Sequence, residues 1–150
     1  MKGGNDYSRQ NIEFHCGEKK GDPFWIRKMP PTATDGGKER YGIGSGKCVL
    51  YMNGDSGNTK NGEVRCNKPI SDTFYIEQDG PNPYQIGFIS GSGTRLCPMV
   101  MNGVIPGNTI PYTGVHNAQF RCDQKTGNRF WIKQGRLLWK NLCMIIINGS

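Results

Sequence analysis

The sequence predicts an all-β fold, a β-trefoil-like barrel with pseudo-three-fold symmetry that is stabilised by disulfides. Its apolar runs are short, rich in Val, Ile, Phe and Tyr, and bounded by Gly, Asn, Asp and Pro, which is typical of strands. No helical stripe with caps interrupts them. A set of cysteine-bearing and aromatic segments also recurs three times, as expected of a closed array of repeats. A β-sandwich is the second choice of architecture, and a three-sheet prism is the third.

The first half of each repeat predicts two strands. An apolar-x-Cys triplet comes first, and a Phe-aromatic-Ile triplet follows it after a short polar turn. The cysteine triplets lie at 14–16, 64–66 and 120–122, and the aromatic triplets at 24–26, 74–76 and 130–132. The alternation of apolar and polar residues around the cysteines indicates strands with one buried face.

The second half of each repeat predicts two more strands. A third strand precedes a Gly-Ser-Gly turn in the first two copies, and a fourth strand runs from a cysteine to an Asn-Gly pair. The fourth strands are expected at 48–53, 97–102 and 143–148. We expect one domain, 1–150, with repeats at about 12–62, 63–117 and 118–150. First and fourth strands would build a six-stranded barrel without exposed edges, and the middle two would form a hairpin that caps one end.

The cysteine usage predicts three disulfides and an oxidising compartment. The chain has six cysteines, no CxxC motif and two histidines, so neither a metal site nor another cofactor is expected. The six residues are Cys16, Cys48, Cys66, Cys97, Cys122 and Cys143. We therefore expect a secreted protein, although the first residues carry no apolar signal-peptide region. No apolar stretch is long enough for a transmembrane helix.

Two disulfide patterns fit the repeat. Pairing within the units gives 16–48, 66–97 and 122–143, and pairing at the junctions gives 48–66, 97–122 and 16–143. Symmetry does not choose between them, because both sets join neighbouring strands of the expected barrel. We favour the within-unit set slightly, since each of its crosslinks forms locally.

The net charge of +7 is spread along the chain, without a run of five basic residues. Such a surface attracts nucleic acids, acidic glycans or anionic membranes, and it is equally compatible with simple solubility. We expect a glycan or a protein surface of acidic character as the partner. Nucleic acid is the less favoured partner, and the sequence does not define the oligomeric state.

The aromatic triplets supply the candidate binding residues. Phe and Ile of a triplet share one face of a strand, so the central aromatic residue points to the other face. If Phe and Ile fill the hairpin cap, the central rings are free to stack on a ligand. With the basic residues that flank them, the candidates are Trp25, Arg27, Lys28, Tyr75, Trp131 and Lys133. The interpretation that places the whole triplet in the core is the favoured one.

A secreted basic ribonuclease-like enzyme is the alternative function. His15 and His116, or Glu39 in place of one of them, are the candidate proton-transfer groups. Arg40, Lys47 or Arg121 would supply the cation for a phosphate. His15 is expected to face outward from its strand, and His116 to lie in a glycine-rich linker. Because no Ser-His-Asp order, carboxylate pair or nucleophilic cysteine is visible, a non-enzymatic recognition domain is the leading expectation.

Overall fold

The computed structural model describes residues 9–16, 21–30, 39–53, 59–78, 84–89, 96–102, 114–128, 130–133, 136–139 and 143–147. For residues 9, 131, 133, 136–139 and 144–146 it describes only the backbone. The described residues form strands and no helix, so the all-β prediction is confirmed. The strands are β1 (Arg9–Cys16), β2 (Trp25–Met29), β3 (Arg40–Ser45), β4 (Cys48–Asn53), β5 (Thr59–Cys66), β6 (Phe74–Gln78), β7 (Tyr84–Ile89), β8 (Leu96–Met101), β9 (Gly114–Arg121), β10 (Trp131–Lys133), β11 (Arg136–Trp139) and β12 (Cys143–Ile147). Within these ranges, no helix is present that is long and apolar enough to cross a membrane.

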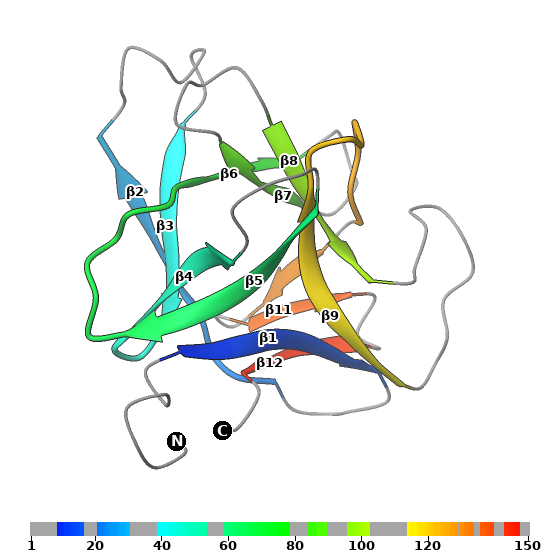
Figure 1. Ribbon diagram of the computed structural model, residues 1–150, viewed down its shortest axis with the longest axis horizontal. Coiled ribbons are helices and arrows are strands. Elements are labelled where there is room, and N and C mark those ends of the chain that lie inside the picture. Colours follow the sequence, from blue (N-terminus) through cyan, green and yellow to red (C-terminus); the bar gives the residue numbers. More distant parts are fainter. Residues whose placement is uncertain are drawn as a thin grey trace.

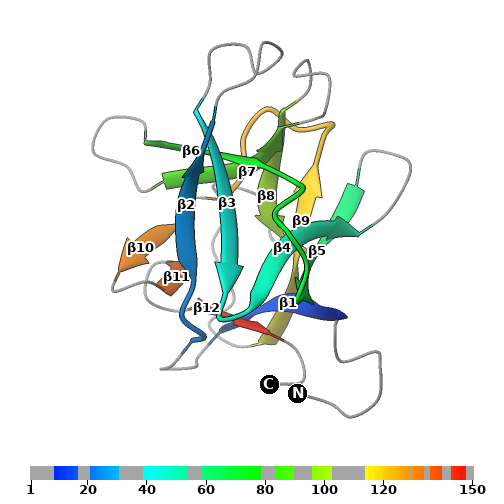
Figure 2. The same ribbon diagram turned by 90° about the vertical axis from the view of Figure 1, so that its left-hand side faces the viewer.

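Eight strands close into a barrel. They follow the order β1-β5-β4-β3-β6-β7-β8-β9, and β9 pairs back onto β1. Outside this ring, β2 pairs with β3, and β12, β11 and β10 continue outward from β1. Figure 2 shows β2 and β3 side by side along one face of the molecule. The closure leaves few unpaired edges, and β2 is one of those that remain.

The barrel differs from the expected six-stranded one in how its strands pair. In the described residues the first and fourth strands of a repeat are not neighbours in the pairing order. The third strand pairs with the fourth instead, as β3–β4, β7–β8 and β11–β12. In the ring, β3 of the first repeat is joined to β6 of the second repeat by the single pair Tyr41↔Phe74. The ring therefore includes middle strands that were expected only in the cap.

The three longest strands, β1, β5 and β9, form a triangle at one end of the barrel (Figure 1). The first half of each strand pairs with the second half of the next strand. Residues 9–11 pair with 63–65, residues 59–61 with 119–121, and residues 114–117 with 13–16. One end of the core is therefore covered by backbone that is already hydrogen-bonded.

All three disulfides are present, and they use the junction pairing. The bonds are Cys16–Cys143, Cys48–Cys66 and Cys97–Cys122. The slight preference for within-unit pairs was wrong. Each fourth strand pairs with the first strand of another unit, so Cys48 lies opposite Cys66 and Cys16 opposite Cys143. Three disulfides indicate a protein that folds in an oxidising environment.

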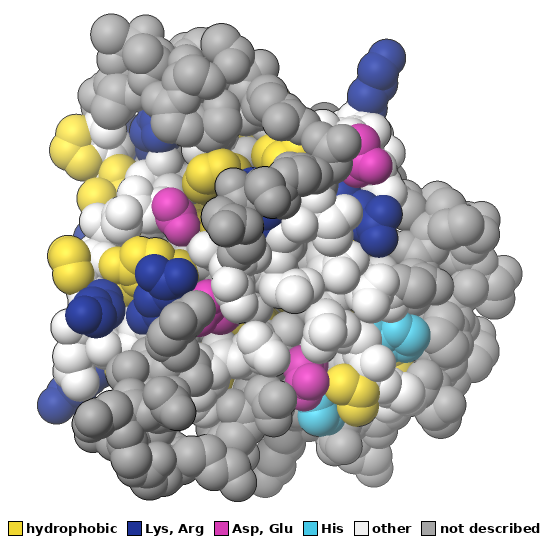
Figure 3. All heavy atoms as spheres, in the orientation of Figure 1, with side chains coloured by type: hydrophobic (Ala, Val, Ile, Leu, Met, Phe, Trp, Pro, Cys, Tyr) yellow, Lys and Arg dark blue, Asp and Glu magenta, His cyan; other side chains and the backbone are white. Residues whose placement is uncertain are grey.

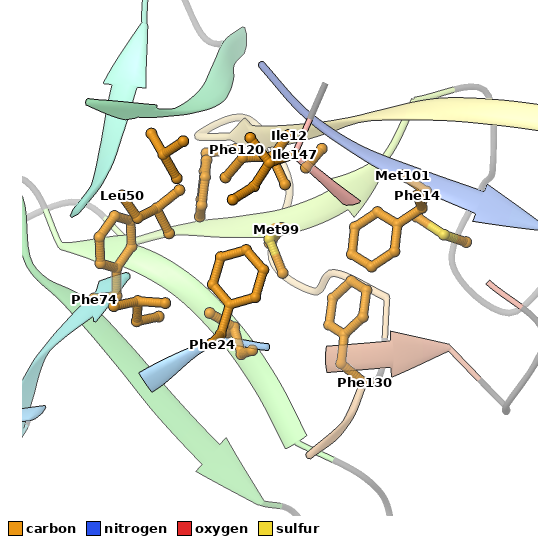
Figure 4. Packing of buried hydrophobic residues seen from close by; sticks show 14 of the residues in the cluster. Ile12, Phe14, Phe24, Leu50, Phe74, Met99, Met101, Phe120, Phe130 and Ile147 are labelled. Carbon is orange, nitrogen blue, oxygen red and sulfur yellow. The ribbon is translucent and has the colours of Figure 1, made fainter. Parts of the chain in front are cut away.

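Aromatic side chains from different repeats meet in the core (Figure 4). Phe14 stacks on Phe130 with 5.0 Å between ring centroids, and Phe74 lies 5.4 Å from Phe120. All four rings are fully buried. Each pair joins a cysteine strand to the Phe of an aromatic triplet in another repeat. The core thus links residues that are far apart in the chain.

A short polar clamp recurs beside these rings. An Asp or Asn stands two residues before the Phe of each aromatic triplet, and its side-chain oxygen accepts a backbone N–H from a fourth strand. The three contacts are Asp22 to Ile147 at 2.7 Å, Asp72 to Met52 at 2.8 Å, and Asn128 to Met101 at 2.8 Å. Each satisfies a backbone donor of a residue that is itself buried.

Candidate ligand-binding face

The candidate aromatic residues differ in their exposure to solvent. Trp25 is half-buried at the start of β2, whereas Tyr75 in β6 is only 2 % exposed. The expectation of a free ring at Tyr75 is therefore wrong, because β6 belongs to the barrel and the ring lies on Gly87 of β7. The side chains of Trp131 and Lys133 lie outside the described part of the chain.

Trp25 is fixed in place on the outer strand β2. Its ring occupies the space that a Cβ would need at Gly44, the residue opposite it on β3. Its indole N–H donates a hydrogen bond of 3.0 Å to the carbonyl oxygen of Gly46. The guanidinium of Arg27 lies over the ring, 5.3 Å from its centroid. This cation–π stack holds an exposed positive charge in a defined orientation.

The opposite face of β2 carries Ile26 and Lys28. The condition that Ile26 fills a hairpin cap is not met, because Ile26 is 36 % exposed on a strand that lies outside the closed ring. The Lys28 ammonium lies 3.0 Å from the Glu39 carboxylate, and the Tyr41 hydroxyl donates to the same carboxylate at 2.8 Å. The hydrogen bond from Lys28, followed by that from Tyr41, lowers the pKa of Glu39, while the Glu39 carboxylate raises the pKa values of Lys28 and Tyr41.

A second stack of the same kind lies on β4 and β5. The guanidinium of Arg65 is 4.6 Å from the centroid of the Tyr51 ring, and its Nη2 lies 3.4 Å from the buried Glu63 carboxylate. Tyr51 is itself fixed, because its hydroxyl donates to the carbonyl oxygen of Pro69. Burial raises the pKa of Tyr51 in spite of the opposing charge of Arg65.

The strand register places both stacks on one face of the sheet. Trp25 lies opposite Gly44, Gly44 opposite Val49, and Val49 opposite Arg65. Residues directly opposite one another point to the same side, so this row crosses four strands on the outer face. Its ends are three strand spacings apart, or about 14 Å.

Two exposed lysines add to the positive charge of this region. Lys47 lies in the β3–β4 turn, and Lys68 follows β5. The two loops touch, because the N–H of Asn67 donates to the carbonyl oxygen of Lys47 at 3.0 Å. We call this surface the basic–aromatic face; it comprises Trp25, Arg27, Lys47, Arg65 and Lys68, together with Tyr51, whose ring is buried beneath Arg65. Figure 3 shows basic side chains beside apolar ones on the left-hand side of the molecule, where Figure 1 draws β3, β4 and one end of β5.

The chemistry of the basic–aromatic face suits an anionic ligand. Guanidinium groups bind carboxylate, sulfate or phosphate through paired N–H donors, and the aromatic rings beneath them restrict their motion. Sequence analysis found Trp25 and Arg27 but missed Tyr51 and Arg65. Arg65 was visible in the cysteine triplet 64–66, where alternation turns it away from the buried Val64.

The candidate proton-transfer residues are only partly brought together. His116 lies in β9 rather than in a linker, and β9 pairs with β1, which carries His15. However, His15 lies opposite Val115, and His116 opposite the buried Phe14, so the imidazoles belong to opposite faces of the sheet. In Figure 3 one histidine lies beside an acidic side chain, and the other histidine lies apart from that pair.

The hydrogen bonds that the structure describes for His15, His116 and Glu39 do not join these three residues to one another, as shared proton transfer would require. His15 Nε2 lies 3.0 Å from the carboxylate of Glu13, and His116 donates from Nδ1 to the carbonyl oxygen of Asn102 at 2.8 Å. Glu39 contacts Lys28 and Tyr41. The partner of His15 is therefore Glu13, not Glu39.

The triangle of β1, β5 and β9 carries a polar motif that sequence analysis missed. A Glu or Gln three residues before each cysteine contacts a His or Arg one residue before it. The contacts are Glu13–His15 at 3.0 Å, Glu63–Arg65 at 3.4 Å and Gln119–Arg121 at 3.4 Å. An Asn five residues before each cysteine lies opposite the Glu or Gln of the neighbouring strand. The repeated Asn-x-Glu/Gln-x-His/Arg-Cys spacing was available in the sequence.

In the part of the chain that the structure describes, no group of three or more His, Cys, Asp or Glu residues is arranged to hold a metal ion. No family model, curated protein or solved structure matches this chain. The structure itself shows a disulfide-linked β-barrel.

Proposed function

We propose that the protein is a secreted recognition domain that binds an acidic ligand through the basic–aromatic face. The observation that carries the proposal is the placement of two arginine–aromatic stacks on one face of the sheet. Arg27 lies over Trp25 and Arg65 over Tyr51, and the register aligns both stacks along one row. The ligand class is a carbohydrate or a protein surface that carries carboxylates or sulfates.

The net charge, the disulfides and the closed barrel of the chain support this proposal. A net charge of +7 favours association with acidic partners through long-range attraction. Three disulfides suit a protein that works outside the cell. A closed barrel also holds surface residues on a rigid frame, so recognition requires no catalytic centre. These properties best suit a lectin-like protein whose ligand is an acidic glycan.

We also propose that the three repeats form a β-trefoil-like arrangement with pseudo-three-fold symmetry. The recurrence of contacts supports this. The middle-strand hairpins, the junction disulfides, the Asp/Asn clamps and the triangle pairings each occur once per repeat. In this arrangement the basic–aromatic face belongs to the first repeat and its junction with the second. Superposition of the three units in an experimental structure, with their cysteines overlaid, is the expected result.

Binding to an array of neutral, carboxylated and sulfated glycans, combined with a salt titration, tests the function. We expect binding to acidic glycans that weakens with salt, because exposed charges are screened. Arg27→Ala should weaken binding, whereas Lys125→Ala, which removes an exposed charge from the β9–β10 connection, should have little effect. Equal losses in the two variants would show that net charge, not this face, determines binding.

The ribonuclease-like function is the second candidate, favoured only by the pairing of the two histidine-bearing strands. Incubation with RNA in the presence of a chelator tests it directly. Cleavage that is lost in a His15→Ala/His116→Ala variant would replace the recognition proposal. Because the two imidazoles lie on opposite faces of the sheet, we expect no such cleavage.

A further inference from the structure

In the part of the chain that the structure describes, strand β2 has one edge that no other strand covers. Among the described residues it pairs only with β3, through all five residues from Trp25 to Met29. In an antiparallel pair, alternate residues direct their N–H and C=O groups away from the partner. The outer side of β2 therefore offers backbone donors and acceptors to an incoming chain.

The side chains of β2 define what chain fits this edge. Arg27 and Lys28 point to opposite faces of the strand, and both are exposed. Ile26 lies between Trp25 and Arg27 and is 36 % exposed, which gives the edge an apolar contact on the face opposite the Trp25–Arg27 stack. An added strand would thus meet the positive charge of Arg27 on one face, where its acidic side chains would be matched, whereas Lys28 on the other face is already paired with Glu39.

A second copy of this chain is a poor occupant. Antiparallel pairing of β2 with itself about Arg27 would place two guanidinium groups directly opposite each other, which is destabilising. The net charge of +7 on each molecule also opposes close approach. Pro23 and Pro30 flank the strand and limit the edge to a short segment. The occupant is therefore a short acidic segment of another protein.

We propose that β2 binds an extended acidic segment of a partner protein as an added β-strand. This inference rests on the proposed function, because Trp25 and Arg27 of β2 belong to the basic–aromatic face. It goes further by making the ligand a protein and by assigning part of the recognition to backbone hydrogen bonds. Arg27, ordered by Trp25, would hold a carboxylate of the added strand.

The test uses a peptide of eight residues that alternates Glu with Val. Its binding to the intact oxidised protein is measured by the change in tryptophan fluorescence and by calorimetry. Two further peptides carry N-methyl groups on either the odd or the even residues, which removes alternate N–H donors but keeps every side chain. A fourth peptide has Gln in place of every Glu, and an acidic glycan is measured in parallel.

Strand addition predicts that one methylated peptide binds about tenfold or more weakly, since its donors to β2 are lost. The other should bind like the parent, because its methyl groups point away from the edge. The Gln peptide and the Arg27→Ala protein should both bind weakly. If the two methylated peptides bind alike, strand addition is wrong, while acidic peptide or glycan binding still supports the proposed function. Failure of both acidic probes overturns the two proposals together.

Discussion

The carboxylate of Asp22 accepts a hydrogen bond from the backbone N–H of Ile147 at 2.7 Å, which joins residues 125 positions apart in the sequence. The contact and the Cys16–Cys143 disulfide lie at opposite ends of the β1–β12 pairing, because Ile147 is opposite Ile12 and Cys143 is opposite Cys16. Covalent and polar links therefore fasten the last strand to the first repeat. The equivalent contacts of Asp72 and Asn128 show that either a carboxylate or an amide oxygen serves as the acceptor.

Asp72→Ala should destabilise the fold by about 1–3 kcal/mol, because the N–H of the buried Met52 would lose its acceptor. Asp72→Asn is the matched control, since Asn128 fills the corresponding role at Met101. We expect the free energy of unfolding of the Asn variant to stay near that of the parent. Denaturant unfolding under oxidising conditions measures both. Equal destabilisation by Ala and Asn would show that the negative charge, not the hydrogen bond, is required.

Removal of the Cys16–Cys143 disulfide should destabilise the protein more than removal of Cys48–Cys66. The first bond closes a separation of 127 residues and the second one of 18. In the chain-entropy description these loops correspond to about 5 and about 3 kcal/mol. Paired Cys→Ser variants, compared by thermal and denaturant unfolding, test the order. Peptide mapping of the oxidised parent should give the junction pairs, and recovery of a 16–48 bond would contradict the fold.

The strands themselves could be predicted from the sequence because apolar periodicity depends only on neighbouring residues. The disulfide pairing could not, since it depends on which strands of different repeats become neighbours. Cys48 lies opposite Cys66 because β4 pairs with β5 rather than with β1. The Asp/Asn-x-Phe motif was also visible in the sequence, but its partners lie on other strands.

The exposure of the candidate binding residues also depends on which strands become neighbours. Trp25 and Tyr75 occupy equivalent positions in their triplets, and each covers a glycine on the next strand. Their exposure differs because β6 is part of the closed ring and β2 is attached outside it. Sequence alternation therefore gave the direction of each side chain within its strand. Whether that face meets solvent depends on the closure of the barrel.

The carboxyl group of Glu39 should titrate below its ordinary pKa of 4.5, because the folded state supplies hydrogen bonds from Lys28 and Tyr41. A depressed pKa means that the contribution to stability is present above the unfolded pKa and is lost as the pH falls through the folded value. The effect on stability should be small, since the Lys28 and Glu39 side chains are both exposed to solvent. An NMR pH titration of the Glu39 side chain measures the shift. Lys28→Ala should raise this pKa toward 4.5, and an unchanged value would show that the ion pair does not persist in solution.

Arg27→Lys should separate stacking from charge in ligand binding. Lysine keeps the positive charge but lacks the planar guanidinium that lies over the Trp25 ring and can hold a carboxylate or sulfate through two N–H donors. We expect Arg27→Lys to weaken binding of an acidic probe by an intermediate amount, and Arg27→Ala to weaken it further. Calorimetry at several salt concentrations should give a similar salt dependence for the parent and the Lys variant, since their charges are equal. Full affinity in the Lys variant would mean that the stack with Trp25 does not contribute and that the face acts only through its charge.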